Sequence, residues 1–211
     1  MTAFAEYLAA REAESTRIPA ARRRALEELA AAMAESLRRS GRAELVFVCT
    51  HNSRRSQFAQ VWAMVAAWRH GLRSVLAASG GTEITACEPR AVAALERAGL
   101  VVTRHGAPPN PVHAIAVPGS AAGTQCWSKR FDDPQNPSQG FLAVMVCSAA
   151  DAACPTVRGA GRRLTLPYED PKAADGTPGE TAAYDRCCAE IARELLYAFR
   201  CAARAAPFTA P

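Results

Sequence analysis

The sequence predicts an α/β fold with a four-stranded parallel sheet flanked by helices. Two short segments, 44–49 and 141–147, are almost wholly apolar and contain β-branched and aromatic residues, as buried parallel strands do. Other segments, such as 55–70, carry apolar residues at three- and four-residue spacing, which is typical of helices. Strands that alternate with helices form a parallel sheet, and such sheets hold their functional sites at the carboxyl ends of the strands.

The composition fits one globular domain with a substantial core. The chain has 211 residues, of which 49% are hydrophobic and 21% are charged. The longest apolar run, 61–68, is far shorter than the roughly 20 residues that cross a bilayer. The first residues have neither the basic region nor the apolar stretch of a secretory signal. We therefore expect a cytoplasmic protein without membrane association.

The charge pattern favours an anionic small substrate over nucleic acid. The net charge is +5, but the basic residues form short, scattered clusters without interleaved aromatic residues. Nucleic-acid-binding surfaces are normally larger and more continuous, so nucleic acid is not an expected partner. A mild positive charge suits an anionic substrate.

Residues 1–42 are expected to form an N-terminal helical extension, and residues 43–211 the α/β domain. In the extension, apolar residues recur at helical spacing from Leu26 to Leu37, and Gly41 ends the run.

Within the domain, the remaining pattern predicts the order of strands and helices. The expected strands are 44–49, 74–79, 141–147 and 163–166, with a further short one at 100–103. The expected helices are 55–70, 89–98 and one that starts with Thr177 as its N-cap and ends at about 205. Residues 105–140 break this rhythm with prolines and short strand-like pieces. We expect them to leave the core as an excursion that covers the site.

Eight cysteines make reactive thiols a reasonable hypothesis. They are Cys49, Cys87, Cys126, Cys147, Cys154, Cys187, Cys188 and Cys201. Their spacing contains no C-x-x-C pair or zinc-ligand pattern, and the chain has no glycine-rich nucleotide loop. No metal and no cofactor are therefore expected.

The segment that begins at Cys49 carries the clearest chemical signal. Cys49 ends a predicted strand, five residues separate it from Arg55, and a predicted helix follows. The expected oxyanion-binding loop consists of Thr50, His51, Asn52, Ser53, Arg54, Arg55 and Ser56. Backbone N–H groups between a strand and a helix can surround a tetrahedral anion, and a guanidinium can bind two of its oxygens.

In this positive environment, Cys49 is expected to act as a thiolate nucleophile on the central atom of the anion. Ser56 can donate a hydrogen bond to the sulfur, and Asn52 can hold the shape of the loop.

The segment Cys49-Thr-His-Asn-Ser-Arg-Arg-Ser-Gln-Phe-Ala resembles the signature loop of the low-molecular-weight protein tyrosine phosphatases and the related thiol-dependent arsenate reductases. The likeness extends to Ser79-Gly-Gly-Thr82 and to the helix 89–98. It covers roughly residues 44–104 and 140–204. The resemblance implies a flavodoxin-like, three-layer fold.

The resemblance also implies a general acid. Tyr168-Glu-Asp170-Pro171 lies where the family has an Asp-Pro pair, so Asp170 would protonate the leaving group. A second such pair, Asp133-Pro134, lies in the excursion and is therefore the less favoured candidate.

Cys147 and Cys154 resemble the redox segment of thioredoxin-coupled arsenate reductases, with six residues between them and Pro155 after them. The resemblance implies reduction of arsenate to arsenite through a relay of Cys49, Cys147 and Cys154. Thioredoxin or another thiol reductant would then reduce the last disulfide. The alternative is a low-molecular-weight protein tyrosine phosphatase that hydrolyses phosphate monoesters with Cys49, Arg55 and Asp170.

Two loop positions depart from the family pattern. His51 stands where many members have Gly, and its side chain would restrict a loop that needs a positive φ there. Arg54 stands where many members have Cys, and we expect it to point outward and attract the anion.

Overall fold

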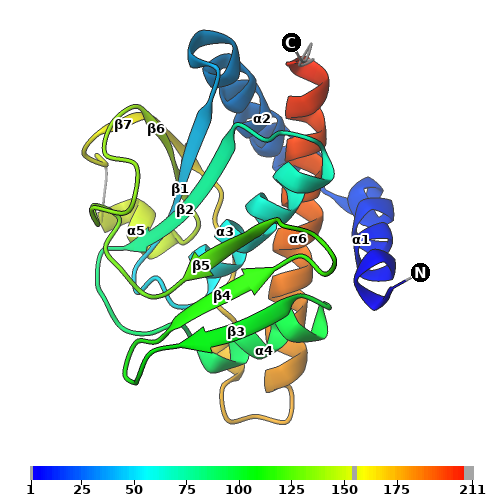
Figure 1. Ribbon diagram of the computed structural model, residues 1–211, viewed down its shortest axis with the longest axis vertical. Helices are drawn as coiled ribbons and strands as arrows, with labels where there is room; N and C mark the ends of the chain where they lie inside the picture. The colour runs from blue at the N-terminus through cyan, green and yellow to red at the C-terminus, as the bar shows by residue number, and fades with distance from the viewer. Residues whose placement is uncertain (1, 154–155, 207–211) are drawn as a thin grey trace.

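A parallel sheet of four strands forms the centre of the molecule. The computed structural model describes residues 2–153 and 156–206. The strands lie in the order β2-β1-β6-β7 (Figure 1). They are β1 Ala43–Cys49, β2 Val75–Gly81, β6 Phe141–Met145 and β7 Ala160–Thr165. The predicted fold class and all four predicted strands are confirmed.

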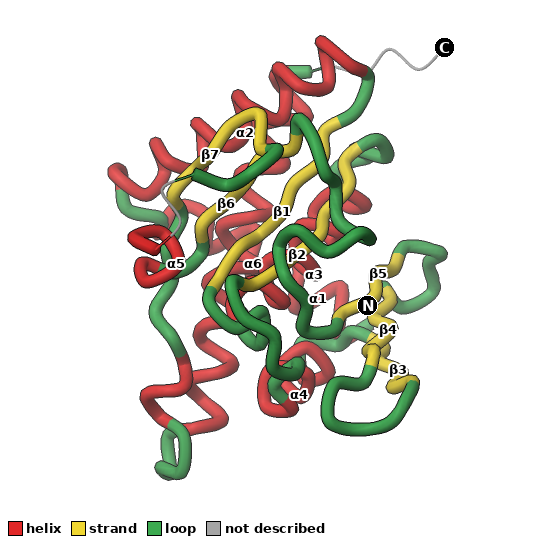
Figure 2. The backbone as a smooth tube through the Cα atoms, turned by 90° about the vertical axis from the view of Figure 1, so that its left-hand side faces the viewer, coloured by secondary structure: helices red, strands yellow, loops and turns green. Residues whose placement is uncertain are grey.

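Helices cover this sheet and continue into the N-terminal extension. The α-helices are α1 Ala3–Ala13, α2 Ala20–Ser40, α3 Arg55–Arg69, α4 Pro89–Arg97, α5 Ser148–Ala153 and α6 Glu180–Ala205. Two short 3-10 helices, Glu14–Arg17 and Pro171–Ala174, join them to their neighbours. Helix α3 packs on β1 and β2 and against α6, and α2 packs along α6. Figure 2 shows α3 and α6 behind the sheet.

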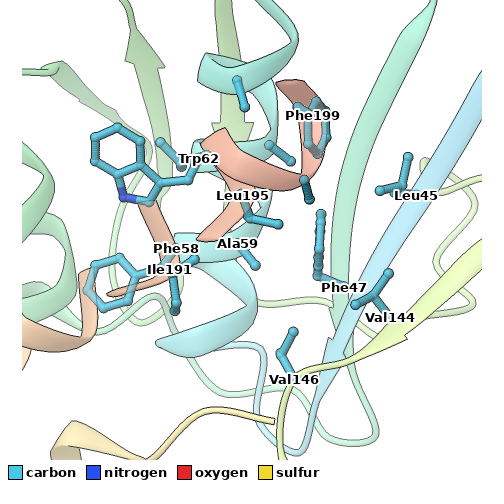
Figure 3. Close-up of a cluster of buried hydrophobic side chains, with 14 of the residues drawn as sticks. Leu45, Phe47, Phe58, Ala59, Trp62, Val144, Val146, Ile191, Leu195 and Phe199 are labelled. Carbon is cyan, nitrogen blue, oxygen red and sulfur yellow. The ribbon is translucent and has the colours of Figure 1, made fainter. Parts of the chain in front are cut away.

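Large apolar side chains fill the space between the sheet and these two helices (Figure 3). In this view Phe47 from β1 lies close to Phe199 from α6, whereas Phe58 and Trp62 from α3 lie to the left of both. All four side chains are fully buried. Burial of such side chains contributes about 1.5–3 kcal/mol each, so this layer holds α3 firmly against the strand that precedes it.

The N-terminal helix α2 follows its sequence signals. It begins after Pro19 and ends at Gly41, whose φ of 72° is the left-handed conformation that closes many helices. The predicted C-terminal helix is also present, but it begins at Glu180 with Gly179 as N-cap. Thr177 instead donates its hydroxyl to the Ala174 carbonyl in the preceding turn.

The excursion forms a second, antiparallel sheet in the order β3-β4-β5. Its strands are β3 Val101–His105, β4 Val112–Ala116 and β5 Gly123–Cys126. The short strand predicted at 100–103 therefore belongs to this second sheet. Strand β3 is largely exposed, so it lacks the apolar faces that a central parallel strand needs.

None of the helices in the described part of the chain has the length and apolar character that crossing a membrane requires.

Candidate active site

Cys49 lies at the floor of the site, at the carboxyl end of β1. Its side chain is buried, and its sulfur lies 3.0 Å from the Ser56 hydroxyl oxygen. The Asn52 backbone N–H donates to the same sulfur over 3.2 Å. With Ser56 as the donor, both hydrogen bonds stabilise negative charge on the sulfur, as nucleophilic attack requires.

Asn52 holds the loop in shape. It has a φ of 47°, a left-handed conformation that Asn tolerates better than most residues. Its fully buried amide nitrogen donates to Ser56 Oγ over 2.8 Å and to Ser79 Oγ over 2.9 Å. Its amide oxygen accepts from the Lys129 backbone N–H. The positive φ falls on Asn52 and not on His51, so the side chain at His51 costs the loop no strain of this kind.

Several backbone N–H groups of the loop remain available to an anion. None of the residues that the structure describes accepts a hydrogen bond from the N–H groups of His51, Ser53 or Arg54. They precede α3, whose N-terminal dipole adds partial positive charge. Such a group of N–H donors before a helix is a favourable environment for phosphate or arsenate.

Asp170 faces this loop from the segment after β7. Its Oδ2 accepts from Arg55 Nη2 over 2.7 Å and from Arg54 Nη2 over 3.2 Å. Its Oδ1 accepts from Arg54 Nε over 2.8 Å and from the Lys172 N–H. Burial raises the pKa of Asp170, but the Arg54 hydrogen bonds and the Arg55 charge outweigh it and lower the pKa. In the free protein Asp170 is therefore a carboxylate.

Arg54 does not point outward as predicted. It is 8% exposed, and its guanidinium lies between Asp170 and Glu88, 4.0 Å from the Glu88 carboxylate. Two carboxylates that the loop sequence does not reveal draw it inward. Arg54 therefore acts on the site through Asp170 and not as an exposed anion attractor.

Cys147 lies beside the loop, immediately after β6. Its sulfur is 3.5 Å from Thr50 Oγ1, and the Ala150 N–H donates to it over 3.2 Å. Burial raises the pKa of Cys147, but these bonds and the charge of Arg55 bring it below its ordinary value. The structure thus places a second thiol, one whose pKa is lowered, next to the residue that follows Cys49.

Cys154, the other predicted redox residue, lies outside the described residues. The remaining cysteines of the described chain are free thiols, and burial raises the pKa of Cys87, Cys126, Cys187 and Cys188. The second Asp-Pro candidate does not line the cavity that contains Cys49. Asp133 instead caps a turn, accepting from the Gln135 N–H.

The excursion supports the loop from behind and does not cover it. Ser128 donates its hydroxyl to the His51 carbonyl over 2.8 Å, and the Lys129 carbonyl accepts from the Gly81 N–H. No residue between 105 and 140 lines the cavity around Cys49. The prediction of a cover was wrong because the segment returns to pair with the end of β2, next to β1.

A small cavity of about 10 Å³ collects the central groups: Cys49, His51, Ser53, Arg54, Arg55 and Asp170. A wider hollow of about 290 Å³ adjoins it and shares His51, Ser53 and Arg54. Glu88 and Lys172 line that hollow, so the region beside the loop is polar and carries both signs of charge.

Another hollow lies away from this site, between β2 and β5, where Trp68, Leu76 and Thr124 line it. No Cys, His, Asp or Glu is among the described residues that line it, so it is not a candidate for the chemistry.

Sequence reasoning missed three contributors to the site. Glu88 holds Arg54, Lys129 holds Asn52 through its backbone, and Tyr168 accepts from Arg55 Nη1 at its carbonyl over 3.0 Å. Tyr168 is part of the Tyr168-Glu-Asp170-Pro171 motif, but the motif indicated a role for Asp170 alone. The other two come from segments whose approach to the loop is set by the tertiary fold.

No family model matches this chain, and no curated protein matches it in sequence. Solved structures do match. A YwlE mutant from Bacillus subtilis has a TM-score of 0.51 and 19% sequence identity, covering 75% of this chain and 97% of that one. The low-molecular-weight phosphotyrosine phosphatase VcLMWPTP-2 from Vibrio cholerae has a TM-score of 0.49 and 12% identity, covering 72% and 92%. DARP, a drosophila arginine phosphatase, has a TM-score of 0.44 and 14% identity, covering 71% and 94%.

At sequence identities this low, structural similarity shows a shared fold alone. Of the three structures, the YwlE mutant is the one with a TM-score above 0.5, so the comparison of folds rests on it. The chain therefore shares the α/β fold of the YwlE structure, as the resemblance to the low-molecular-weight phosphatases implied.

Proposed function

We propose that the protein is a phosphate monoester hydrolase that works through a covalent phosphocysteine at Cys49. One observation carries the proposal: a single small cavity brings together a buried thiol, a guanidinium and a carboxylate, Cys49, Arg55 and Asp170. These are a nucleophile, an oxyanion ligand and a proton carrier, the three roles that the reaction needs.

In the first step the phosphate of the substrate enters the loop, and Arg55 leaves Asp170 to bind two of its oxygens. The Cys49 sulfur attacks phosphorus in line with the ester oxygen. The S–P bond forms and the P–O bond breaks. Asp170, having taken up a proton, gives it to the departing oxygen, so that an alcohol leaves.

In the second step water attacks the phosphorus of the phosphocysteine. Asp170, now a carboxylate, takes the proton of that water, and the S–P bond breaks. Inorganic phosphate and the Cys49 thiolate result, so no redox change occurs and no further reagent is needed. The hydrogen bonds from Asn52 and Ser56 stabilise the thiolate as it leaves.

The test is hydrolysis of p-nitrophenyl phosphate, a phosphotyrosine peptide and a phosphoarginine peptide by the wild-type protein and by Cys49→Ser. The proposal expects release of inorganic phosphate from at least one ester and none from Cys49→Ser. Cys201→Ser is the matched control, because Cys201 lies on α6 outside the cavity. Equal activity in Cys49→Ser would contradict the proposal.

Arsenate reduction is a second candidate, and the position of Cys147 favours it. Arsenate would form an S–As bond with Cys49. The Cys147 thiolate would then attack the Cys49 sulfur, forming an S–S bond and breaking the S–As bond, so that two electrons pass to arsenic and arsenite leaves. A thiol reductant such as thioredoxin would restore both thiols. Cys154, which the resemblance places next in the relay, lies outside the described residues.

Cys147→Ser separates the two candidates. Under the second, it abolishes arsenite formation and spares hydrolysis of p-nitrophenyl phosphate. If the wild-type protein forms no arsenite with thioredoxin and its reductase present, the second candidate is wrong and the first stands.

A further inference from the structure

The N-terminal extension reaches the segment that carries the proposed general acid. Arg22, in the first turn of α2, donates from Nε to the Glu194 carboxylate on α6 over 2.9 Å. The same guanidinium lies over the Tyr168 ring, 4.4 Å from its centroid. The Glu194 side chain is 1% exposed and that of Arg22 19%, so both contacts are largely shielded from water.

Tyr168 connects this contact to the loop. Its backbone N–H donates to the Val146 carbonyl over 3.1 Å, which fixes the segment against the end of β6. Its carbonyl accepts from Arg55 Nη1, while Nη2 of the same guanidinium bonds Asp170. Tyr168 therefore sets the position of both Arg55 and Asp170.

The segment itself has little regular structure to hold it. Strand β7 ends at Thr165, and the next element is the 3-10 helix that begins at Pro171. In between, the Leu166 and Tyr168 N–H groups bond the end of β6, and the buried Tyr168 ring is the large side chain that anchors the segment. A planar guanidinium stacked on that ring fixes its orientation by cation–π attraction and contact.

We propose that Arg22 is a positioning residue for catalysis: through the Tyr168 ring, it holds the segment from 168 to 170 so that Asp170 can protonate the leaving group. The N-terminal extension is then part of the catalytic apparatus and not a packing element alone. The inference rests on the proposed phosphatase function for its kinetic consequence, but the coupling from Arg22 to Tyr168 can be measured without it.

The kinetic test compares Arg22→Met on two substrates. Phenyl phosphate has a poor leaving group and depends on the general acid, whereas p-nitrophenyl phosphate has a good one and depends on it little. We expect kcat/KM, which reports the step in which the leaving group departs, to fall about tenfold for phenyl phosphate, part of the roughly 10²–10⁴-fold that a general acid supplies. For p-nitrophenyl phosphate kcat/KM should fall less than about threefold. Arg38→Met is the matched control, because Arg38 also joins α2 to α6, at the Ala205 carbonyl, far from Tyr168 along the helix.

A second variant separates positioning from folding. Arg22→Met leaves Glu194 buried and unpaired, which destabilises a protein more than the loss of both charges. Arg22→Met/Glu194→Gln removes that charge, so the fold is retained while the Tyr168 ring stays uncovered. The selective loss on phenyl phosphate should persist in this double variant, and Arg22→Lys, which keeps the charge but not the planar contact, should recover only part of it.

Amide hydrogen exchange gives a readout that needs no turnover. In the double variant the Tyr168 amide should exchange at least about tenfold faster than in the wild type, while the Phe47 amide in β1 stays unchanged. In Arg38→Met the Tyr168 amide should exchange at the wild-type rate. Unchanged exchange at Tyr168, or equal losses on the two substrates in a folded double variant, would overturn the inference. A wild-type protein that hydrolyses neither substrate would refute the proposed function, and the exchange result would still decide the coupling.

Discussion

The Arg55 guanidinium donates to the Asp170 carboxylate over 2.7 Å, so the proposed oxyanion ligand and the proposed acid are bonded to each other in the free protein. Arg55 must exchange this partner for the oxygens of the substrate. The exchange also moves the positive charge of Arg55 away from the Asp170 carboxylate. The carboxylate is then easier to protonate at the point where the leaving group needs a proton. Binding of the anion and preparation of the acid are thereby one event.

Arg55→Lys should lower kcat/KM for p-nitrophenyl phosphate by about 10²-fold or more, the usual effect of losing an oxyanion ligand. Lysine keeps the charge but cannot bind two phosphate oxygens with one planar group. Steady-state kinetics checks this, with Arg69→Lys, on the last turn of α3, as control. A variant with wild-type kcat/KM would show that Arg55 does not bind the substrate.

Asp170→Asn should reduce kcat/KM by about 10²-fold or more on phenyl phosphate and much less on p-nitrophenyl phosphate, because the amide cannot give a proton to the leaving group. The Asp132→Asn variant is the control, since Asp132 pairs with Arg130 outside the cavity. Equal effects on both substrates would mean that Asp170 has a purely structural role.

Arg54→Met should change the pH dependence on phenyl phosphate. Arg54 lowers the pKa of Asp170, so its removal raises that pKa and increases the protonated fraction at any given pH. The pH at which kcat/KM begins to fall on the alkaline side should therefore move upward. Arg90→Met, which also removes a partner of Glu88 but lies outside the cavity, should leave the profile in place. A shift to lower pH would contradict the account.

Gly81→Ala should distort the oxyanion loop. A methyl group at Gly81 would lie 2.6 Å from the Thr50 carbonyl oxygen and 2.9 Å from the Asn52 nitrogen. We expect a loss of about 1–3 kcal/mol in unfolding free energy, as for overpacked sites, and a fall in kcat. Gly179→Ala is the control, because its Cβ meets Thr177 at an ordinary 3.6 Å. If thermal unfolding and kinetics of Gly81→Ala match those of Gly179→Ala, the loop accommodates the added methyl group without distortion.

The parallel sheet and the residues of the loop could be predicted because their signals are local. The apolar runs that became β1 and β6, and the five residues between Cys49 and Arg55, are visible without tertiary information. The place of the excursion could not be predicted in this way. It depends on contacts such as that of Ser128 with the His51 carbonyl, which join residues far apart in the sequence.

Arg54 shows the same limit for a single side chain. An arginine in a loop next to an anion site is expected to face water, and here two distant carboxylates, Asp170 and Glu88, bury it. The link from Arg22 to Tyr168 likewise depends on how α2 lies along α6, which no local pattern encodes.

The central claim is that Cys49 carries the phosphoryl group, and rapid-quench mass spectrometry during turnover of p-nitrophenyl phosphate tests it most directly. The account predicts a phosphoryl group on Cys49 that appears within one turnover and disappears when the substrate is exhausted. Continued hydrolysis with Cys49 unmodified at every time point would contradict it.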